Sequence, residues 1–423
     1  MKTSMLAIET AESQPQPKLR VMWLACPDYS LGVAHGGNLR LFNYARELVS
    51  QGHDVHLVVL QKKTDFEDER TSCLNELKRA KIITDFVELE YHHPRLRGKL
   101  SHLLFHPALV NRSLRKQQAP VIDAIRQIIA GRQINICVCS ARDSLFVLPK
   151  IKKEVKCIID WVDSYFLYHV RELRLHVKKL RALRFLKSLR LLAVAFVQER
   201  YYGRQCALNL TVSPVDKKYL DFANGEPSKN HFLLNGVVAQ RANGIPKIKG
   251  RLIFTGNMDF PPNYESAIWF IDRVFPLLRE RSDVRLVIAG ANPVPDLVAR
   301  SSEQIEVTGY AENLRREIAR SQLYVAPLIC GGGFKNKVVE AITSGTYLVG
   351  TSLAVEFLGG RMRRLLTVAD TPRQMAEAIL TYLRAPQDFA SRLETLKEIV
   401  DEEFTWRNKS KEFIEILRQQ VAS

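Results

Sequence analysis

Short apolar runs alternate with segments of helical spacing along most of the chain. In the first half the runs span 20–26, 54–60, 134–139, 156–160 and 207–212. A second set follows at 252–255, 284–289, 305–308, 323–327, 347–350 and 365–368. Apolar runs of this length that alternate with helices are typical of buried parallel strands. The pattern predicts an α/β protein with two doubly wound, Rossmann-like domains in tandem.

Polar and glycine-rich segments mark the expected boundaries of these domains. Residues 1–18 are polar, contain two prolines and lack the apolar core of a signal peptide, so we expect a disordered tail. Residues 239–250 contain two glycines and a proline and are expected to form the linker. We therefore predict an N-terminal domain over 19–243 and a C-terminal domain over 244–404. The strand ends of both domains would face a central cleft, where ligands bind in such sheets.

Length and cysteine usage indicate where the protein works. The chain has 423 residues and no apolar window of about 18 residues that would span a membrane. Its seven cysteines show no Cys-x-x-Cys spacing, and most lie in apolar runs. We expect buried, reduced thiols and a cytoplasmic protein, either free or peripheral at the inner face of the membrane.

The net charge of +17 predicts an anionic partner. Residues 171–190 contain eight Lys or Arg and one acid, with apolar residues at every third or fourth position. This predicts a basic amphipathic helix, which either docks on an anionic membrane surface or presents the solvated face of a core helix. A second basic stretch spans 95–116. No basic motif interleaved with aromatic residues is present, so no nucleic acid is expected as a partner, and a nucleic-acid-binding protein remains a minor alternative.

The segment 325–345 is the strongest candidate for chemistry. An apolar run ends at Pro327, three glycines follow at 331–333, and a helical pattern then carries Lys337 and Glu340. Bare N–H groups and the dipole at a helix start favour a bound anion, and glycine lets the backbone approach it closely. The segment is neither a Walker A loop nor a Gly-x-Gly-x-x-Gly fingerprint. Taken alone, three successive glycines usually form a plain flexible turn.

The surrounding residues carry a resemblance to a known family. Lys337 to Ile342 and Gly345 resemble the nucleotide-sugar signature of retaining family-4 glycosyltransferases, which have the GT-B fold. Further matches follow the family's order at 36–40, 52–55, 234–237, 254–258, 288–290, 308–310 and 404–406. The resemblance implies that a last helix, over 405–423, crosses back onto the N-terminal domain. Residues 159–164 and 199–200 resemble a branch associated with bacterial exopolysaccharide assembly.

The resemblance implies that the C-terminal domain binds a nucleotide-diphosphate sugar. Lys337 and Lys335 would neutralise the diphosphate, and Glu340 would accept hydrogen bonds from ribose hydroxyls. The other implied donor contacts, several of them through the backbone, are Gly36, Gly37, Gly256, Asn257, Gly309, Tyr310, Gly332, Gly333 and Phe334. No metal and no further cofactor are implied.

Gly332 departs from the family's pattern. Many members have an acid eight positions before the residue that matches Glu340, where it contacts the donor sugar. Here that position is Gly332, and the loop after Gly256 also lacks the basic residue that many members carry. Backbone N–H groups would then have to hold the sugar. A catalytically inactive nucleotide-sugar-binding scaffold of a polysaccharide assembly complex is therefore the alternative to an active enzyme.

Asp160 and Asp163 are the acidic candidates for catalysis, beside Lys337. They bracket Trp161 at the end of an apolar strand, where an acid can orient an acceptor hydroxyl or cap a helix equally well. The resemblance implies retaining, metal-independent transfer of a sugar to a glycan or lipid-linked acceptor in surface or exopolysaccharide synthesis. Lysines, N–H groups and a helix dipole would stabilise the leaving diphosphate. The same fold serves epimerases and phosphorylases, but their cofactor-lysine motif is absent.

Overall fold

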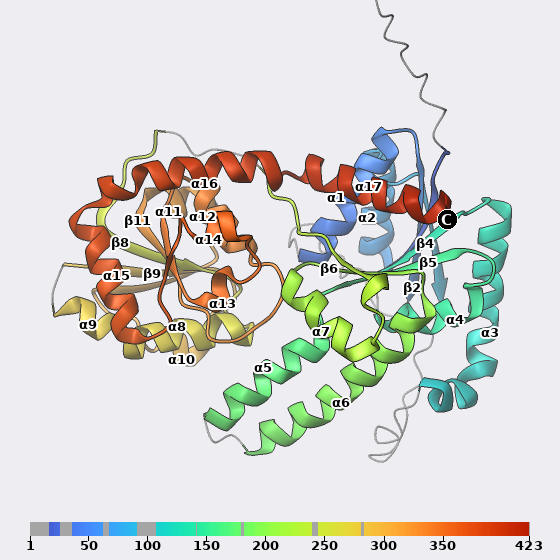
Figure 1. Cartoon of the computed structure of the whole chain (residues 1–423), viewed down its shortest axis with the longest axis horizontal. Coiled ribbons are helices and arrows are strands. Elements are labelled where there is room, and N and C mark those ends of the chain that lie inside the picture. The colour runs from blue at the N-terminus through green and yellow to red at the C-terminus, as the bar shows by residue number, and fades with distance from the viewer. Residues whose placement is uncertain are drawn as a thin grey trace, which may run out of the picture.

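The computed structural model describes residues 17–25, 36–61, 67–90, 107–140, 142–178, 182–238, 244–280 and 283–422. Over these residues the chain forms two α/β domains that lie side by side (Figure 1). Both sheets are parallel, and both are covered by helices, as the alternating pattern predicts. The predicted tail over 1–18 lies, up to residue 16, outside the described residues.

Within the described residues, the sheet of the N-terminal domain has seven strands in the order β3-β2-β1-β4-β5-β6-β7. Its strands are β1 (Arg20–Ala25), β2 (Asp54–Gln61), β3 (Asp85–Glu90), β4 (Ile136–Cys139), β5 (Lys156–Val162), β6 (Leu208–Thr211) and β7 (Asn230–Phe232). The helices longer than one turn are α1 (Gly36–Ser50), α2 (Glu67–Arg79), α3 (Pro107–Gly131), α5 (Tyr165–Lys178), α6 (Ala182–Gln205) and α7 (Pro214–Asn224), and the shorter ones are η1 (Arg142–Val147), α4 (Leu148–Ile151) and η2 (Pro227–Lys229).

The described part of the C-terminal domain has a six-stranded sheet in the order β10-β9-β8-β11-β12-β13. Its strands are β8 (Ile248–Thr255), β9 (Arg285–Ala289), β10 (Ile305–Gly309), β11 (Ser321–Ala326), β12 (Leu348–Gly350) and β13 (Thr367–Val368). The helices around it are α8 (Pro261–Arg273), α9 (Phe275–Arg279), α10 (Pro295–Val298), α11 (Leu314–Arg320), α12 (Asn336–Thr343), α13 (Ser352–Val355), α14 (Gly360–Arg363), α15 (Pro372–Arg384), η3 (Pro386–Phe389) and α16 (Ala390–Glu403).

Each predicted apolar run overlaps one of these strands, and the prediction missed only β3 and β7. Both are edge strands of the first sheet. Strand β3 contains three acidic residues among its six and is only half-buried, and β7 is three residues long. Edge strands need no continuous apolar run, because one side of each stays open. The predicted linker also reached too far, since β8 begins at Ile248 rather than after Gly250.

The last helix, α17 (Trp406–Ala422), crosses from the C-terminal domain to the N-terminal one, as the resemblance implied (Figure 1). Its residues Phe413, Ile414 and Leu417 belong to the apolar core around β1 and α1. The ring of Phe413 stacks on Tyr44, with 4.5 Å between the ring centroids. The N-terminal domain therefore takes part of its core from the end of the described chain.

The two chain segments that pass between the domains run against each other. Val237 donates a backbone hydrogen bond to Phe404 (2.6 Å), and a Cβ atom on Gly236 would lie 2.4 Å from Cα of Trp406. Only glycine permits this approach. The family matches at 234–237, which contain Asn-Gly-Val, and at 404–406, which read Phe-x-Trp, thus lie against each other. They form one contact between the two segments that connect the domains.

The basic segment 171–190 is not one helix, and this prediction was wrong. It contains the end of α5 and the beginning of α6, which pack along each other as a hairpin that projects from the N-terminal domain (Figure 1). Of the apolar residues in this repeat that the structure describes, Val177, Leu183 and Leu186 are exposed, so most of the repeat faces solvent. The second basic stretch, 95–116, lies outside the described residues as far as residue 106. None of the helices in the described ranges is both long enough and apolar enough to cross a membrane.

Candidate functional site

The glycine loop, which we define as residues 327–335, joins β11 to α12. Lys335 precedes α12, and no side chain caps the first turn of this helix. Its N–H groups and the positive end of the helix dipole are therefore available to an anion. The ring of Phe334 packs on Phe357 (4.5 Å between centroids), so any contact of this residue with a donor would use its backbone.

Lys337 and Glu340 lie close together on α12. The ammonium group of Lys337 donates to Oδ1 of Asn263 (2.5 Å) and lies 4.8 Å from the centre of the Phe254 ring. Burial lowers the pKa of Lys337 to about 7, against the opposing attraction of Glu340. Burial raises the pKa of Glu340, and Arg315 and Lys337 oppose that shift. A diphosphate at α12 would supply the negative charge that favours the protonated lysine.

The carboxyl ends of β8, β9 and β10 form a rim of the C-terminal domain, which we call the donor rim. Gly256 donates its N–H to Ala289 (3.1 Å), and Gly290 donates to Gly309 (2.9 Å), so the loops after β8, β9 and β10 are tied together. The side chain of Asn292 donates to Asn257 (3.3 Å) across the rim. Tyr310 is 78% exposed beyond it. The structure thus ties Gly256, Asn257 and Gly309 into one rim, and it brings Gly256 beside α12, since a Cβ atom there would lie 2.8 Å from Nζ of Lys337.

The N-terminal side of the predicted donor site is described only in part. Gly36 and Gly37 are the first residues of α1, at the carboxyl edge of the first sheet. Residues 26–35, which precede them, lie outside the described residues. The roles of Gly36 and Gly37 therefore stay predictions.

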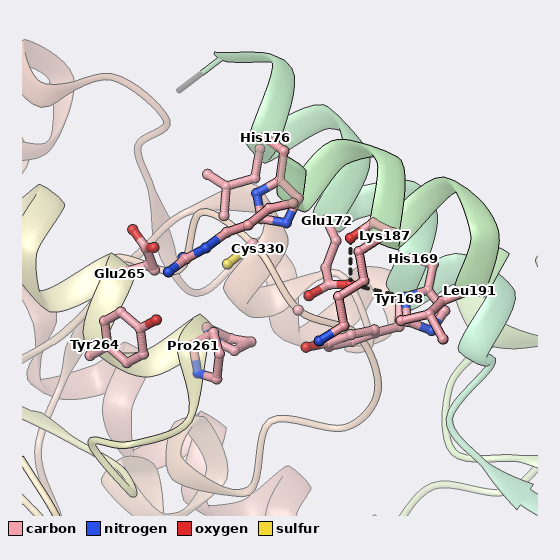
Figure 2. A pocket seen from close by; sticks show the side chains of 15 residues that line it. Tyr168, His169, Glu172, His176, Lys187, Leu191, Pro261, Tyr264, Glu265 and Cys330 are labelled. Carbon is pink, nitrogen blue, oxygen red and sulfur yellow. Dashed lines mark hydrogen bonds and ion pairs between the residues drawn. The ribbon is translucent and has the colours of Figure 1, made fainter. Parts of the chain in front are cut away.

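A cleft of about 520 Å³ separates α5 and α6 of the N-terminal domain from α8 of the C-terminal domain (Figure 2). Tyr168 and Lys187 line one side of the cleft, and Pro261 and Tyr264 line the other. It reaches the glycine loop at Cys330 and Gly331, whereas none of the predicted donor residues lines it. The cleft is therefore a space between the domains that is separate from the rim of donor residues.

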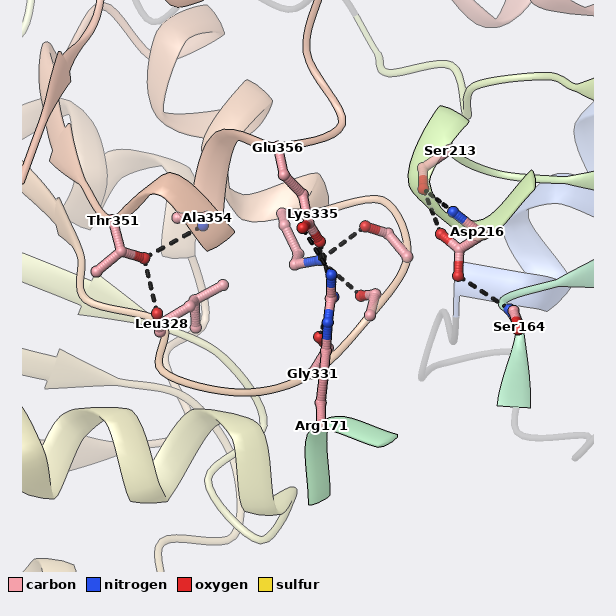
Figure 3. A network of polar contacts seen from close by, with 12 residues as sticks. Ser164, Arg171, Ser213, Asp216, Leu328, Gly331, Lys335, Thr351, Ala354 and Glu356 are labelled. Atoms are coloured by element: carbon pink, nitrogen blue, oxygen red, sulfur yellow. Dashed lines mark hydrogen bonds and ion pairs between the residues drawn. The ribbon is translucent and has the colours of Figure 1, made fainter. Parts of the chain in front are cut away.

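Arg171 joins the two domains beside this cleft. Its guanidinium group forms a bidentate ion pair with Glu356 of the C-terminal domain (2.8 and 2.7 Å) and donates to the carbonyl of Gly331 (2.5 Å) (Figure 3). Bidentate pairs of this kind fix orientation as well as distance. In the sequence, Arg171 stands only in a basic run and Glu356 stands in no motif, so this contact could not be predicted.

Lys335 is turned into the glycine loop. Its buried ammonium group donates to the carbonyls of Gly332 and Gly333, at 2.7 Å each, and lies 3.6 Å from Glu356 (Figure 3). Burial lowers the pKa of Lys335, and Glu356 opposes that shift. In this arrangement the lysine holds the shape of the loop, while Lys337 stands at the helix start.

Two acids of the N-terminal domain face the glycine loop. A Cβ atom on Gly332 would lie 3.8 Å from Oδ1 of Asp216, and one on Gly333 would collide with Asp163. Burial, followed by the charge of Asp216, raises the pKa of Asp163 to about 7, and Lys335 and Arg40 oppose the shift. Burial also raises the pKa of Asp216. Asp216 was not predicted as a site residue, although Ser213 three positions earlier gives the spacing of a helix cap.

Ser164 fixes the turn that carries Asp163. Its N–H donates to Asp216 (2.9 Å) and its hydroxyl group donates to the buried carboxylate of Glu199 (3.1 Å to Oε2). The turn begins at Val162, which has a φ of 61°. A β-branched residue in this region is strained, and such strain persists only where the surroundings enforce it. The backbone is thereby turned so that Asp163 reaches the other domain.

Asp160 lies deeper in the N-terminal domain than Asp163. It is fully buried and forms an ion pair with Arg40 (2.7 Å), which also donates to Leu233 and Asn235. Its Oδ1 atom has no hydrogen-bond partner within the described ranges. The two aspartates that the sequence treated alike therefore have different surroundings. Over the same ranges, no three His, Cys, Asp or Glu side chains converge to hold a metal ion.

The six cysteines that fall within the described residues are all buried and in no disulfide, as the sequence predicts. One of them, Cys330, lines the interdomain cleft.

Comparison with known proteins agrees with this fold. Residues 249–385, most of the C-terminal domain, match the family described as glycosyl transferases group 1. Over nearly its whole length the chain is similar to solved structures with the GT-B fold, and its two facing parallel domains share that fold. The comparisons thus show the GT-B fold for the chain and a similarity of its C-terminal domain to glycosyl transferases group 1.

Three solved structures illustrate the similarity. HepE of Anabaena in complex with UDP has a TM-score of 0.64 at 13% identity, over 95% of this chain and 100% of that one. A glycosyltransferase from Rickettsia africae has a TM-score of 0.63 at 12% identity, over 96% and 99%. A TarM mutant of S. aureus, in complex with fondaparinux, alpha-GlcNAc-glycerol and UDP, has a TM-score of 0.63 at 10% identity, over 96% and 100%.

A relative is also found among curated sequences. An uncharacterized 44.6 kDa protein in the cps region of Klebsiella pneumoniae is 27% identical over 142 residues. The match covers 31% of this chain and 36% of that protein, so the chain spans about a third of the length of the relative that it matches.

Proposed function

We propose that the protein is a retaining glycosyltransferase of family 4, which moves a sugar from a nucleotide-diphosphate sugar to a glycan or lipid-linked acceptor. The observation that carries the proposal is the arrangement on α12. An uncapped helix start follows the glycine loop, and Lys337 and Glu340 lie behind it beside the Gly256 rim. This combination offers a diphosphate N–H groups and a cation, and offers a ribose a carboxylate.

The residues divide the reaction between the two domains. Lys337 and the N–H groups of α12 would stabilise the charge that develops on the leaving diphosphate, without a metal ion. Asp163 approaches the loop from the acceptor side, where it would orient the attacking hydroxyl group. The leaving phosphate would take the acceptor proton on the same face of the sugar, so the configuration at the anomeric carbon is retained.

A role in surface or exopolysaccharide synthesis is part of the proposal. It is supported by the capsule-region relative in Klebsiella and by the residues that resemble the exopolysaccharide branch. We further propose a cytoplasmic protein that docks at the inner face of the membrane through the α5–α6 hairpin. Exposed Leu183, Leu186 and Leu189 alternate there with basic residues, which suits a membrane surface.

A panel of UDP-, GDP-, ADP- and TDP-sugars tests the donor site by thermal shift. UDP-sugars come first because UDP is the ligand named for two of the similar structures. We expect a shift with one nucleotide class, and its loss in Lys337→Ala and Glu340→Ala. No shift with any nucleotide sugar, in a protein that melts cooperatively, would contradict the proposal.

Turnover then separates an enzyme from a binding scaffold. We expect release of the nucleoside diphosphate with acceptor present, and a product whose anomeric configuration, read by proton NMR, equals that of the donor. Binding without turnover over a broad acceptor panel would favour the inactive scaffold, and an inverted product would contradict retention.

A further inference from the structure

Asn263, in the first turn of α8, binds the side chain of Lys337. Its amide oxygen accepts a hydrogen bond from the Lys337 ammonium group (2.5 Å), and its amide NH₂ group donates to the backbone carbonyl of Asn257 (2.8 Å). A carbonyl can only accept and an ammonium group can only donate, so these two partners fix which way the amide is turned. Asn263 is buried, which strengthens both bonds.

Two further residues confine the Lys337 ammonium group. The centre of the Phe254 ring lies 4.8 Å from it. A Cβ atom on Gly256 would lie 2.8 Å from Nζ of Lys337 and 2.7 Å from Nδ2 of Asn263. Any side chain at position 256 would therefore displace the lysine, the asparagine or both. The glycine of the donor rim leaves room for their contact.

The charge of Lys337 has no ionic partner. In the part of the chain that the structure describes, no carboxylate forms an ion pair with this lysine. Glu340 attracts it from one turn further along α12, and Lys335 repels it from the glycine loop, whereas α8 and β8 present the uncharged Asn263 and Phe254 to it. An amide oxygen can hold an ammonium group in place, but it cannot neutralise it. The charge is therefore left for a ligand.

We propose that Asn263 is a positioning residue, which holds the Lys337 ammonium group where the diphosphate binds and adds no charge that would compete with the ligand. Through Asn257 it also joins this lysine to the donor rim. A carboxylate at the same place would form a buried ion pair with Lys337, which an entering diphosphate would have to break. This inference rests on the proposed function, since it names a residue that serves the same donor site.

The variant Asn263→Asp tests the role of the missing charge without any ligand. Its carboxylate keeps an oxygen for the ammonium group and adds a negative charge, so the pKa of Lys337 should rise by about one to three pH units. The NMR signal of the lysine Cε atom, followed in protein labelled with carbon-13 lysine and assigned with Lys337→Arg, reports this pKa.

Asn408→Asp is the matched control for the added charge. Asn408 is exposed on α17, and its amide likewise donates to a backbone carbonyl, that of Glu402 (2.7 Å). The control should leave the Lys337 signal and the binding of UDP as they are in the unchanged chain.

Calorimetric titration with UDP tests the consequence for binding. At pH 6, where Lys337 is charged in either protein, Asn263→Asp should bind UDP about tenfold or more weakly than the unchanged chain. At pH 8 the unchanged chain should take up most of one proton with UDP, whereas Asn263→Asp should take up little, because its lysine is already charged. Asn263→Leu keeps the volume but removes both hydrogen bonds, so it should bind UDP several-fold more weakly and keep the proton uptake.

The proposal is overturned if Asn263→Asp leaves the pKa of Lys337 unchanged, or if Asn263→Leu binds UDP as tightly as the unchanged chain. A residue that only holds the loop after β8 would lower the melting temperature and the affinity in both variants, but it would move neither the Lys337 signal nor the proton uptake. Failure of the unchanged chain to bind any nucleotide would contradict the proposed donor site instead. The NMR signal is measured without nucleotide, so the two failures are told apart.

Discussion

The carboxylate of Asp163 fills the space that a side chain on Gly333 would need, because its Oδ1 atom lies 1.8 Å from the position of a Cβ there. The two residues belong to different domains, so this contact forms only where the two domains meet. Gly333 also has a φ of 71°, which other residues adopt only with strain.

Gly333→Ala should therefore be far more harmful than Gly332→Ala. We expect it to lower the free energy of unfolding by about 2 kcal/mol and turnover by about tenfold or more, through strain and displacement of Asp163. At Gly332 the nearest atom to a new Cβ is 3.8 Å away, an ordinary contact. Thermal melts and initial rates of both variants make the comparison. Equal behaviour of the two variants would show that the contact has no consequence.

The two aspartates that bracket Trp161 should respond in opposite ways to amidation. Asp160→Asn leaves the buried Arg40 without its counter-charge, which should cost about 3 to 5 kcal/mol of stability. Asp163→Asn removes a carboxylate whose pKa burial raises to about 7, so the folded state loses stability relative to the unfolded chain as the pH rises from about 4 to about 7. At pH 8 we expect this variant to melt no lower than the unchanged protein while its turnover falls. Melting curves and rates at that pH decide between a catalytic and a purely structural residue.

Nucleotide binding should weaken as the pH rises through about 7. Lys337 has a pKa of about 7 without ligand, and a bound diphosphate raises it, so binding takes up a proton above that pH. For one group the limit is a tenfold loss of affinity per pH unit. Asp163 ionises in the same range, and its negative charge acts in the same direction.

The two sources of this pH dependence can be separated by titrating UDP calorimetrically in buffers of different ionisation enthalpy. Lys337→Arg should bind UDP with less proton uptake, since arginine stays charged, whereas Asp163→Asn should keep the contribution of the lysine. An affinity that is constant between pH 6 and pH 8.5 would rule out the shifted pKa of Lys337.

Arg171→Gln should loosen the two domains. The half-buried pair with Glu356 lies between the domains, and we expect its loss to cost about 2 kcal/mol and to increase the radius of gyration in solution scattering. Arg361→Gln is the matched control, because its contacts with Glu402 and Glu403 are exposed and 3.6 and 3.5 Å long. The control should change stability by less than about 1 kcal/mol. A compact Arg171→Gln protein would show that other contacts hold the domains closed.

The strands and the glycine loop with its helix could be predicted because both depend on local sequence. Buried parallel strands require continuous apolar runs, and the glycine loop with Lys337 and Glu340 lies within one stretch of chain. The edge strands β3 and β7 escaped because an edge can be short or half-polar.

The contacts between the domains could not be predicted in the same way. Arg171 and Glu356 are separated by 185 positions, and Asp163 meets Gly333 only after both domains have folded and docked. Lys335 shows a different limit. Its position in the sequence suits a residue that binds phosphate, but its ammonium group already donates hydrogen bonds to the loop carbonyls of Gly332 and Gly333. Spacing places a side chain near a site but does not say which of two nearby partners it binds.

Helix α17 also sets the order in which the protein can be completed during translation. The core around β1 lacks Phe413, Ile414 and Leu417 until these residues have left the ribosome, and by then every strand of the second domain has already emerged. The domain that is synthesised first is therefore finished last. A nascent chain carries an unfilled apolar groove on its first domain throughout elongation, and it is in this period that a chaperone would be needed.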